Sequence, residues 1–280
     1  MPPRCCRDAW TARGTGVPVP EGDTVWRTAL HLDRALTGAT LVETDFRVPA
    51  HATLDLSGRV VEATLARGKH LLTRIGADHT LHTHLRMEGS WHLYRPGTRW
   101  RRPAYDARVV LRTADWTAVG FSLGITEVVA RDAEDTVVGH LGPDLLGPDW
   151  DEAEALRRLL AEPARPVAEA ILDQRNLAGV GNLYKSELCF VTGVNPWLPV
   201  GEVPDLPRLV RRARAALEAN KNRVEQTMTG DTRRGRQHWV YRRERQPCRR
   251  CGTRVLVAQQ GPATQERATY WCPVCQPEGR

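Results

Sequence analysis

Four cysteines near the C-terminus have the spacing of a metal site. They form two Cys-x-x-Cys pairs separated by 20 residues: Cys248, Cys251, Cys272 and Cys275. Each pair directs two thiolates toward one point, and two pairs complete a tetrahedral site suited to zinc. Because four protein ligands leave no position for water, one structural Zn2+ is expected, holding together a hairpin too small to fold alone. Chance thiol pairs or a redox pair are the alternatives.

A proline followed by a carboxylate begins the segment PEGDTV, at Pro20 and Glu21. Inside a chain this pair carries no particular chemistry. At a free N-terminus the proline would be a nucleophilic secondary amine, and Glu21 beside it would serve as an acid or a base. The pair therefore predicts chemistry only if the working chain begins at Pro20.

Lysine is rare in this chain, since only three of its 40 basic residues are lysines. One of them, Lys69, precedes an apolar run in ARGKHLL. A lysine in a chain that otherwise uses arginine favours a role for a compact amine that can lose its proton. A solvated strand residue fits the pattern equally well.

Residues 171–190, ILDQRNLAGVGNLYKSELCF, contain two helical patterns joined by glycines. The AGVG turn brings backbone amides to the start of a helix that opens at Asn182, and such a helix N-terminus is suited to binding phosphate. An ordinary glycine turn between two helices is the plainer interpretation.

The elements that would position these residues change along the chain. Up to about residue 140, short runs of β-branched and apolar residues, broken by Gly, Pro and Asp, predict antiparallel strands. A helix over 24–36, with Thr24 as its N-cap, is expected before them. A Gly- and Pro-rich linker over 141–150 is followed by helical patterns, the last over 206–227.

Length and composition set broad limits. The 280 residues, 41% hydrophobic, allow two domains with cores and a small appendage. No apolar run reaches about 18 residues, and residues 1–19 lack the apolar stretch of a secretory signal, so a cytoplasmic protein is expected. Seven cysteines, an odd number, argue against a disulfide framework.

The positive charge lies in the last quarter of the chain. Residues 205–280 hold 17 Lys and Arg against 7 Asp and Glu, within a net charge of +7. Such a local basic field favours a polyanionic partner, with nucleic acid first and a membrane surface second. A well-solvated basic surface is the alternative.

Taken in chain order, the motifs resemble the formamidopyrimidine-DNA glycosylase and endonuclease VIII family. They are PEGDTVWRTA, ARGKHLL, HLRMEGSW, LDQRNLAGVGNLYKSE and the four-cysteine motif, running from Pro20 to about Gln276. PEGDTV is more similar to the endonuclease VIII branch, of the actinobacterial type. The resemblance implies an α+β multidomain fold: an N-terminal β-sandwich with flanking helices, a helix–two-turn–helix domain and a C-terminal zinc-finger β-hairpin.

The resemblance also gives domain boundaries and partners. A non-native extension is expected over 1–19, the β-sandwich catalytic domain over 20–140, the linker over 141–150, the helix–two-turn–helix domain over 151–240 and the zinc finger over 241–280. Damaged DNA would bind between the domains of a monomer, in the cytoplasm at the nucleoid and without membrane contact.

By the same resemblance, Pro20 is the nucleophile that attacks C1′ of the damaged nucleoside and forms a covalent iminium as the base leaves. Glu21 would protonate the sugar ring oxygen as the ring opens. Lys69 would bind a phosphate flanking the lesion and assist strand cleavage by elimination.

Three further residues would contact DNA. Asn182 and Arg267 would grip the same phosphate region from the glycine turn and the zinc hairpin. Met87, in HLRMEG, would fill the gap left by the flipped base. A buried strand methionine is the alternative for Met87.

Two features depart from the family pattern. The spacer between the cysteine pairs is longer than expected, which predicts a longer hairpin tip. Pro20 is preceded by 19 residues, and an internal proline has no free amine. We therefore expect the working enzyme to begin at Pro20, because a GTG codon for Val19 can start translation with methionine and such starts are frequent in the high-GC genomes that the arginine bias indicates.

The resemblance thus implies a bifunctional DNA glycosylase and abasic-site lyase of base excision repair, acting mainly on oxidised pyrimidines. One alternative is an oxidised-purine glycosylase for formamidopyrimidine or 8-oxoguanine. The others are a non-catalytic binder of damaged DNA and a zinc-ribbon protein that binds nucleic acid.

Overall fold

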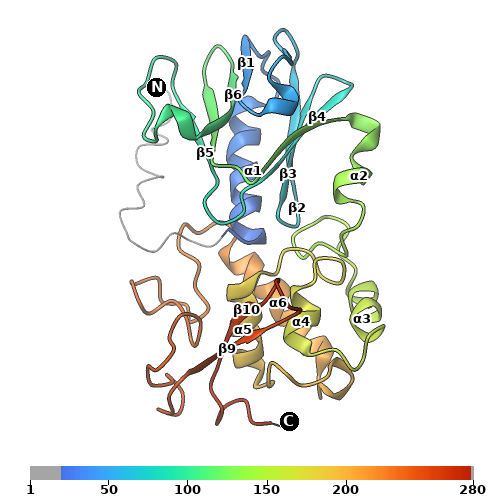
Figure 1. Cartoon of the computed structure of the whole chain (residues 1–280), viewed down its shortest axis with the longest axis vertical. Coiled ribbons are helices and arrows are strands. Elements are labelled where there is room, and N and C mark those ends of the chain that lie inside the picture. Colours follow the sequence, from blue (N-terminus) through green and yellow to red (C-terminus); the bar gives the residue numbers. More distant parts are fainter. Residues whose placement is uncertain (1–19, 279–280) are drawn as a thin grey trace, which may run out of the picture.

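The computed structural model describes residues 20–278, so the extension predicted over residues 1–19 lies outside the described part. Two bodies follow one another along the long axis of the molecule (Figure 1). One contains the first helix and eight strands, and the other contains the later helices and a two-stranded hairpin. This is the α+β multidomain arrangement that the sequence predicts.

The first body is a β-sandwich. One sheet has the strand order β1-β6-β7-β5, the other has β2-β3-β4-β8, and all the pairs are antiparallel. The strands are β1 (Glu43–Phe46), β2 (Val61–Arg67), β3 (His70–Ile75), β4 (His79–His84), β5 (Ser90–Tyr94), β6 (Ala107–Arg112), β7 (Thr117–Phe121) and β8 (Ile125–Ala130).

The alternation of side chains along β3 explains what each face of its sheet contacts. Leu71 and Ile75 point into the sandwich core, where α1 (Gly22–Leu36) also packs. Leu72 points to the other face and packs with Val138, just before the linker, with Leu141 of the linker and with Ala178 of the glycine turn. Because successive strand residues face opposite sides, one short strand both closes the core and joins the two bodies.

Helix α1 begins two residues earlier than predicted. Thr24 is not its N-cap: the helix starts at Gly22, and Glu21 occupies the N-cap position. The side chain of Glu21 makes no hydrogen bond to its own helix, because it binds a different one. The predicted cap at Thr24 is therefore wrong, because the N-cap position belongs to Glu21, whose side chain binds the start of α5.

The second body is helical. After the short α2 (Asp135–Val138), it contains α3 (Glu152–Leu160), α4 (Val167–Leu172), α5 (Asn182–Thr192) and α6 (Leu206–Asn220), with their apolar faces in one core. The predicted helix over 206–227 is too long. It ends at Asn220, whose side chain donates to the Thr227 carbonyl and accepts from the Thr227 amide, so the chain folds back.

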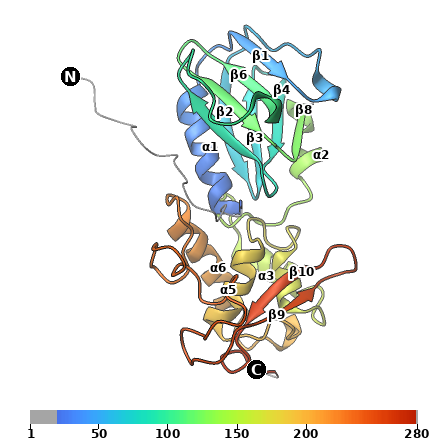
Figure 2. The same cartoon turned by 60° about the vertical axis from the view of Figure 1, so that its left-hand side comes forward.

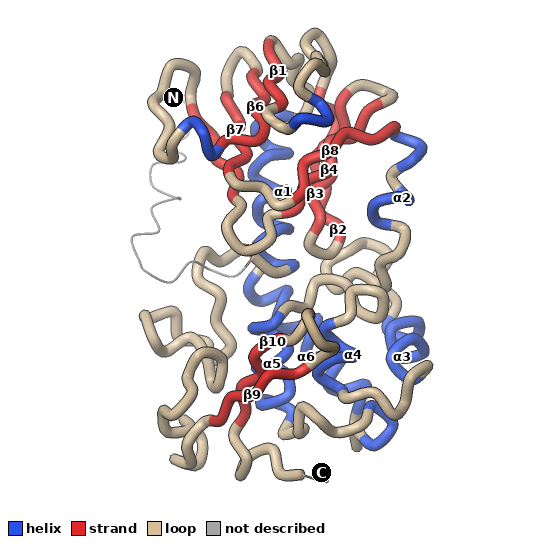
Figure 3. Tube along the Cα trace, in the orientation of Figure 1, coloured by secondary structure: helices blue, strands red, loops and turns tan. Residues whose placement is uncertain are grey.

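A hairpin of β9 (Leu256–Gln260) and β10 (Arg267–Trp271) completes the chain and lies against α5 (Figure 2). Figure 3 shows how strands dominate the first body and helices the second, with a long irregular segment between α6 and β9. Within residues 20–278, no helix has the length and apolar character needed to cross a membrane.

Candidate active site

The carboxylate of Glu21 lies at the N-terminus of α5. Oε2 accepts hydrogen bonds from the amides of Gly181 at 2.8 Å and Tyr184 at 3.3 Å, and Oε1 accepts one from Leu183 at 2.7 Å. These amides lack partners within their own helix and lie at the positive end of its dipole. The glycine turn predicted to bind phosphate thus has its amides occupied by a protein carboxylate.

Glu21 is fully buried, and burial has the largest effect on its pKa. Burial raises the pKa of Glu21 to about 7, although the positive charge of Lys69 and the backbone amides act in the opposite direction. A carboxyl with a pKa near neutrality can both hold and release a proton under working conditions. Glu21 therefore has the properties of a general acid.

Two glycines make this arrangement possible. A Cβ on Gly181 would lie 2.4 Å from Cδ of Glu21, and a Cβ on Gly22 would lie 2.8 Å from Cα of Gly179. The Gly22 amide also donates to the Gly179 carbonyl at 2.9 Å. The glycines of AGVG therefore form the turn and also allow the start of α1 to approach it closely.

Pro20 immediately precedes this buried carboxylate and is itself partly exposed. The start of α1 is fixed on both sides, by the Glu21 side chain and the Gly22 amide. Pro20 is consequently held at the junction of the two bodies, next to the acid.

Lys69 lies in the two-residue turn between β2 and β3. Gly68 adopts φ 58° there, and its amide donates to Oδ2 of Asp144 at 2.7 Å. Asp144 belongs to the linker, so the linker carboxylate fixes the turn that presents the lysine.

Three charged residues from distant parts of the chain influence one another at this junction. Burial lowers the pKa of Lys69, the negative charge of Glu21 raises it, and the positive charge of Arg267 lowers it. Arg267 is exposed at the start of β10. Lys69, Glu21 and Arg267 therefore lie close enough to influence one another electrostatically.

Asn182 connects α5 to the hairpin. Its Nδ2 donates to the Ala268 carbonyl at 2.9 Å, while its Oδ1 is buried without a partner. Asn182 therefore contacts the residue that follows Arg267 in β10. Its amide nitrogen is engaged by the hairpin, which adds a docking role to the predicted phosphate contact.

Met87 lies in the turn between β4 and β5, and the residue is 57% exposed. The alternative of a buried strand methionine is wrong, because β4 ends at His84 and the chain turns before Met87. An exposed apolar side chain on a turn matches the predicted gap-filling role.

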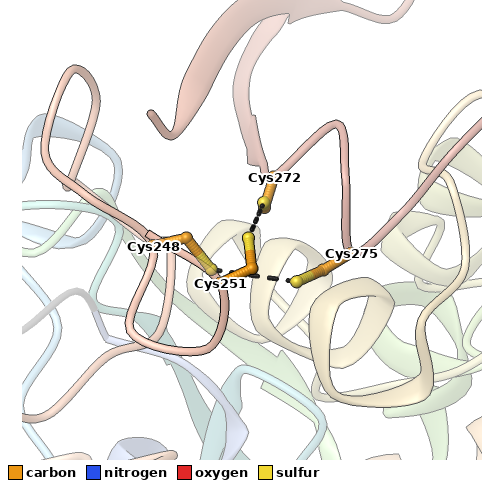
Figure 4. A group of neighbouring side chains, drawn as sticks. All are labelled: Cys248, Cys251, Cys272 and Cys275. Carbon is orange, nitrogen blue, oxygen red and sulfur yellow. Dashed lines mark hydrogen bonds between the residues drawn. The ribbon is translucent and has the colours of Figure 1, made fainter. Parts of the chain in front are cut away.

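The four cysteines converge as expected (Figure 4). Their sulfur atoms all lie within 4.8 Å of one another, with Cys251 and Cys272 at 3.4 Å and Cys248 and Cys275 at 3.9 Å. Four thiolates bound to one tetrahedral zinc at about 2.3 Å would be about 3.8 Å apart. The donor set and its spacing therefore fit zinc, while Cys189 is buried elsewhere in the helical core.

Sequence reasoning missed a second buried carboxylate. Asp23 accepts hydrogen bonds from Tyr184 Oη at 3.0 Å and from Gln226 Nε2 at 2.8 Å. Tyr184 thereby contacts both carboxylates, Glu21 through its amide and Asp23 through its hydroxyl. No sequence pattern marks this contact, because Asp23 and Gln226 are 203 positions apart.

Two residues of α5 were also missed. Lys185 is buried and donates to Thr269 Oγ1 at 2.7 Å, which binds the helix to the hairpin. Glu187 is buried and accepts three backbone amides, those of Trp239, Val240 and Tyr241. The rarity of lysine that drew attention to Lys69 applies equally to Lys185 and would have found it.

The chain is similar in sequence to known DNA-repair proteins. The model of the formamidopyrimidine-DNA glycosylase N-terminal domain matches residues 19–122. A protein of Streptomyces coelicolor named probable endonuclease 8 2 is 55% identical over 261 residues, covering 92% of this chain and 94% of that protein. The DNA-(apurinic or apyrimidinic site) lyase Nei2 of Mycolicibacterium smegmatis is 52% identical, covering 92% and 99%.

Solved structures agree on the fold. Formamidopyrimidine-DNA glycosylase of Lactococcus lactis, bound non-covalently to DNA containing an abasic site, superposes with a TM-score of 0.75 at 20% identity, covering 92% of this chain and all of that one. MutM in complex with DNA containing carbocyclic 8-oxo-G gives the same TM-score at 21% identity and the same coverage. With relatives above 50% identity over almost their whole length, the chain belongs to the formamidopyrimidine-DNA glycosylase and endonuclease 8 family.

Proposed function

We propose that this protein is a bifunctional DNA glycosylase and abasic-site lyase of base excision repair, acting mainly on oxidised pyrimidines. The observation that carries the proposal is the buried carboxyl of Glu21, held by the amides of the glycine turn directly beside Pro20. Membership of the family and the names of its relatives support the same reaction class. The preference for pyrimidines rests on the similarity to endonuclease 8 proteins.

In this proposal the amine of Pro20 attacks C1′ of the damaged nucleoside. A bond forms between that nitrogen and C1′, the glycosidic bond breaks, and the base leaves with its bonding electrons and takes up the proton that the amine loses. Glu21 gives its proton to the ring oxygen as the sugar opens, leaving an iminium between Pro20 and C1′. Loss of a proton from C2′ then expels the 3′ phosphate by elimination, and water releases Pro20.

The remaining residues hold the DNA. Lys69 and Arg267 supply positive charge for a phosphate beside the lesion, and Asn182 supports them from the start of α5. Such contacts fix the position of a DNA backbone without reading its sequence. All of the proposed groups come from one chain, which is consistent with a monomer.

Zinc is proposed as the metal of the four-cysteine cluster, bound by Cys248, Cys251, Cys272 and Cys275. When bound, it supplies a structural cross-link and no reactive position, because all four coordination sites are taken by thiolates. The residues of the chain do the rest: β9 and β10 carry Arg267 toward the junction, and α5 binds β10 through Lys185.

The mechanism requires a free amine on Pro20, so we include in the proposal that the working enzyme begins there. A match to the family that starts at residue 19 supports this boundary. The secondary amine of a terminal proline is the only form of this residue that can make the iminium.

Borohydride trapping tests the proposal, because reduction turns an iminium into a permanent cross-link between protein and DNA. A panel of duplexes with an oxidised pyrimidine, 8-oxoguanine, formamidopyrimidine or a pre-formed abasic site should give the strongest trapping with the abasic and pyrimidine substrates. Binding without cross-linking on every duplex would identify a non-catalytic binder instead, and a preference for 8-oxoguanine would overturn the substrate assignment.

A further inference from the structure

One arginine of the β-sandwich makes contacts that the proposed reaction leaves unexplained. Arg102 lies in the segment 95–106 that joins β5 to β6. Its Nη1 donates to the Glu88 carbonyl at 3.1 Å and to Ser90 Oγ at 3.2 Å. Its Nη2 donates to Ser122 Oγ at 2.8 Å and to Asp106 Oδ2 at 3.2 Å.

These contacts join two loops that are separate in sequence. Glu88 belongs to the turn that presents Met87, and Ser122 belongs to the turn between β7 and β8. The guanidinium also lies over the ring of Phe121, with its carbon 5.5 Å from the ring centre. A planar group with five donors in a fixed fork can hold two loops in one relative position, which a lysine cannot do.

Backbone strain and local hydrogen bonds restrict the conformation of the turn that carries Met87 and of the neighbouring turn at Ser122. Arg86 has φ 55° and Ser122 has φ 47°, which are unfavourable values for residues with a side chain. The Arg86 amide donates to His84 Nδ1 at 2.9 Å, and the Gly89 amide donates to the Leu85 carbonyl at 2.9 Å. Such backbone conformations persist only where surrounding contacts stabilise them.

The two loops are also in direct contact. A Cβ on Gly124 would lie 2.0 Å from Cγ of Arg86, so the Arg86 side chain packs on the bare backbone of the second loop. Arg102 and the Arg86–Gly124 contact therefore hold the same pair of loops at two points.

The turn that carries Met87 lies at the same end of its sheet as Lys69. Strand β4 ends at His84, which pairs with His70, the residue after Lys69. The Met87 turn thus leaves the sheet at the same end as the proposed phosphate-binding lysine. An apolar side chain that enters a base stack binds more tightly if it is already ordered, because fixing it during binding would cost conformational entropy.

We propose that Arg102 is a positioning residue that holds the Met87 turn in the conformation that enters DNA at the lesion. The inference rests on the proposed function, since it assumes that Met87 fills the gap. Arg102 acts on DNA through the turn and not as a phosphate contact, because its donors are already directed at protein acceptors, including the carboxylate of Asp106.

The experiment measures gap filling without requiring any reaction. A duplex carries a tetrahydrofuran abasic analogue with 2-aminopurine opposite, whose fluorescence rises when its stacking is disturbed. The full chain is titrated with this duplex and with an undamaged one. We expect Arg102→Ala and Met87→Ala each to lose roughly half or more of the fluorescence rise, while the affinity of Arg102→Ala for undamaged DNA stays within about two-fold of the parent.

Two variants separate geometry from charge. Arg102→Lys keeps the charge but not the fork, and should behave like Arg102→Ala. Arg99→Ala removes an exposed arginine of the same segment and should leave the fluorescence rise unchanged. Ser122→Ala removes only the shortest of the four contacts, so it should give a smaller loss even if Arg102→Ala fails to fold.

Full fluorescence in Arg102→Ala, or its restoration by lysine, would overturn the inference. So would a parent protein that gives no rise, because Met87 would then not enter the stack. Failure of the proposed function looks different: the form that begins at Pro20 would fail to cross-link abasic DNA under borohydride, whatever the 2-aminopurine signal.

Discussion

A hydrogen bond of 2.8 Å joins the amide of Gly181 to the carboxylate of Glu21, across 160 positions of the chain. It connects the start of α5 to the start of α1. The same contact that joins the two bodies of the molecule also buries the proposed acid. The packing of the two bodies and the pKa of Glu21 therefore depend on the same contact. Loss of either partner should disturb both.

The first prediction concerns the proton on Glu21. Because its pKa is raised to about 7, the carboxyl is protonated below that pH and loses its proton as the pH rises. Excision of a damaged base needs this proton, whereas a pre-formed abasic site already opens to an aldehyde. The ratio of excision to abasic-site trapping should therefore fall about ten-fold per pH unit above 7.

Glu21→Gln should lower excision by about 100-fold or more, while abasic-site trapping changes far less. Single-turnover rates on the two substrates provide the measurement. Glu43→Gln, at an exposed carboxylate of β1, is the matched control and should leave both rates unchanged. Equal loss of both activities in Glu21→Gln would show that the residue does not act as the ring-opening acid.

The second prediction concerns the phosphate contacts. Lys69→Ala, Asn182→Ala and Arg267→Ala should each weaken binding or turnover on lesion DNA by about ten-fold or more, since a charged hydrogen bond to phosphate contributes about 1.5 to 3 kcal/mol. Binding of the parent should also fall steeply with salt. Titrations at several salt concentrations measure both effects.

Arg254→Ala, an exposed arginine near the same hairpin, is the control and should bind like the parent. The three variants should retain the thermal stability of the parent, apart from Asn182→Ala, which also loses a contact to Ala268. If all three bind and cut normally, the proposed position of the DNA is wrong.

The third prediction concerns the metal. Purified protein should contain one zinc per chain, and Cys251→Ala should release it and abolish DNA binding while the helical signal in circular dichroism remains. The reason is that the helices have their own core, whereas the hairpin that carries Arg267 depends on the cluster.

Cys189→Ala is the matched control, since this buried cysteine lies outside the cluster and should leave the zinc content unchanged. Elemental analysis of both variants decides the matter. Clean protein without zinc, or a Cys251→Ala variant that retains it, would contradict the assignment.

The fourth prediction concerns the start of the working chain. Two forms are compared, the full 280 residues and one in which methionine replaces Val19 as the first residue, so that trimming exposes Pro20. Only the short form should cross-link lesion DNA with borohydride, because an internal proline has no nucleophilic amine. The α-amino group, with a pKa of about 7.7 to 8.0, is neutral enough to react near neutrality.

Pro20→Gly in the short form should impair the cross-link, which ties the effect to the residue and not to the length of the chain. Mass spectrometry verifies each N-terminus. A full-length protein of verified mass that cross-links equally well would rule out both the start site and the role of Pro20.

The sequence by itself determined those features that local spacing encodes. Cys248 and Cys251 are three positions apart, and a short knuckle directs both sulfurs to one point whatever surrounds it. The glycine turn before Asn182 and the amphipathic pattern of α6 are likewise properties of neighbouring residues. For these, the local chemistry leaves few alternatives, so a pattern suffices.

The tertiary structure decided which side chains meet. Glu21 caps α5 instead of its own helix, Asn220 ends α6 by binding Thr227, and Asp23 meets Gln226 across 203 positions. Each is a choice among many possible partners, made when the bodies pack and buried polar groups must find hydrogen bonds. The spacing of residues along the chain does not predict which of these polar groups pair, so the pairs are seen only in the folded protein.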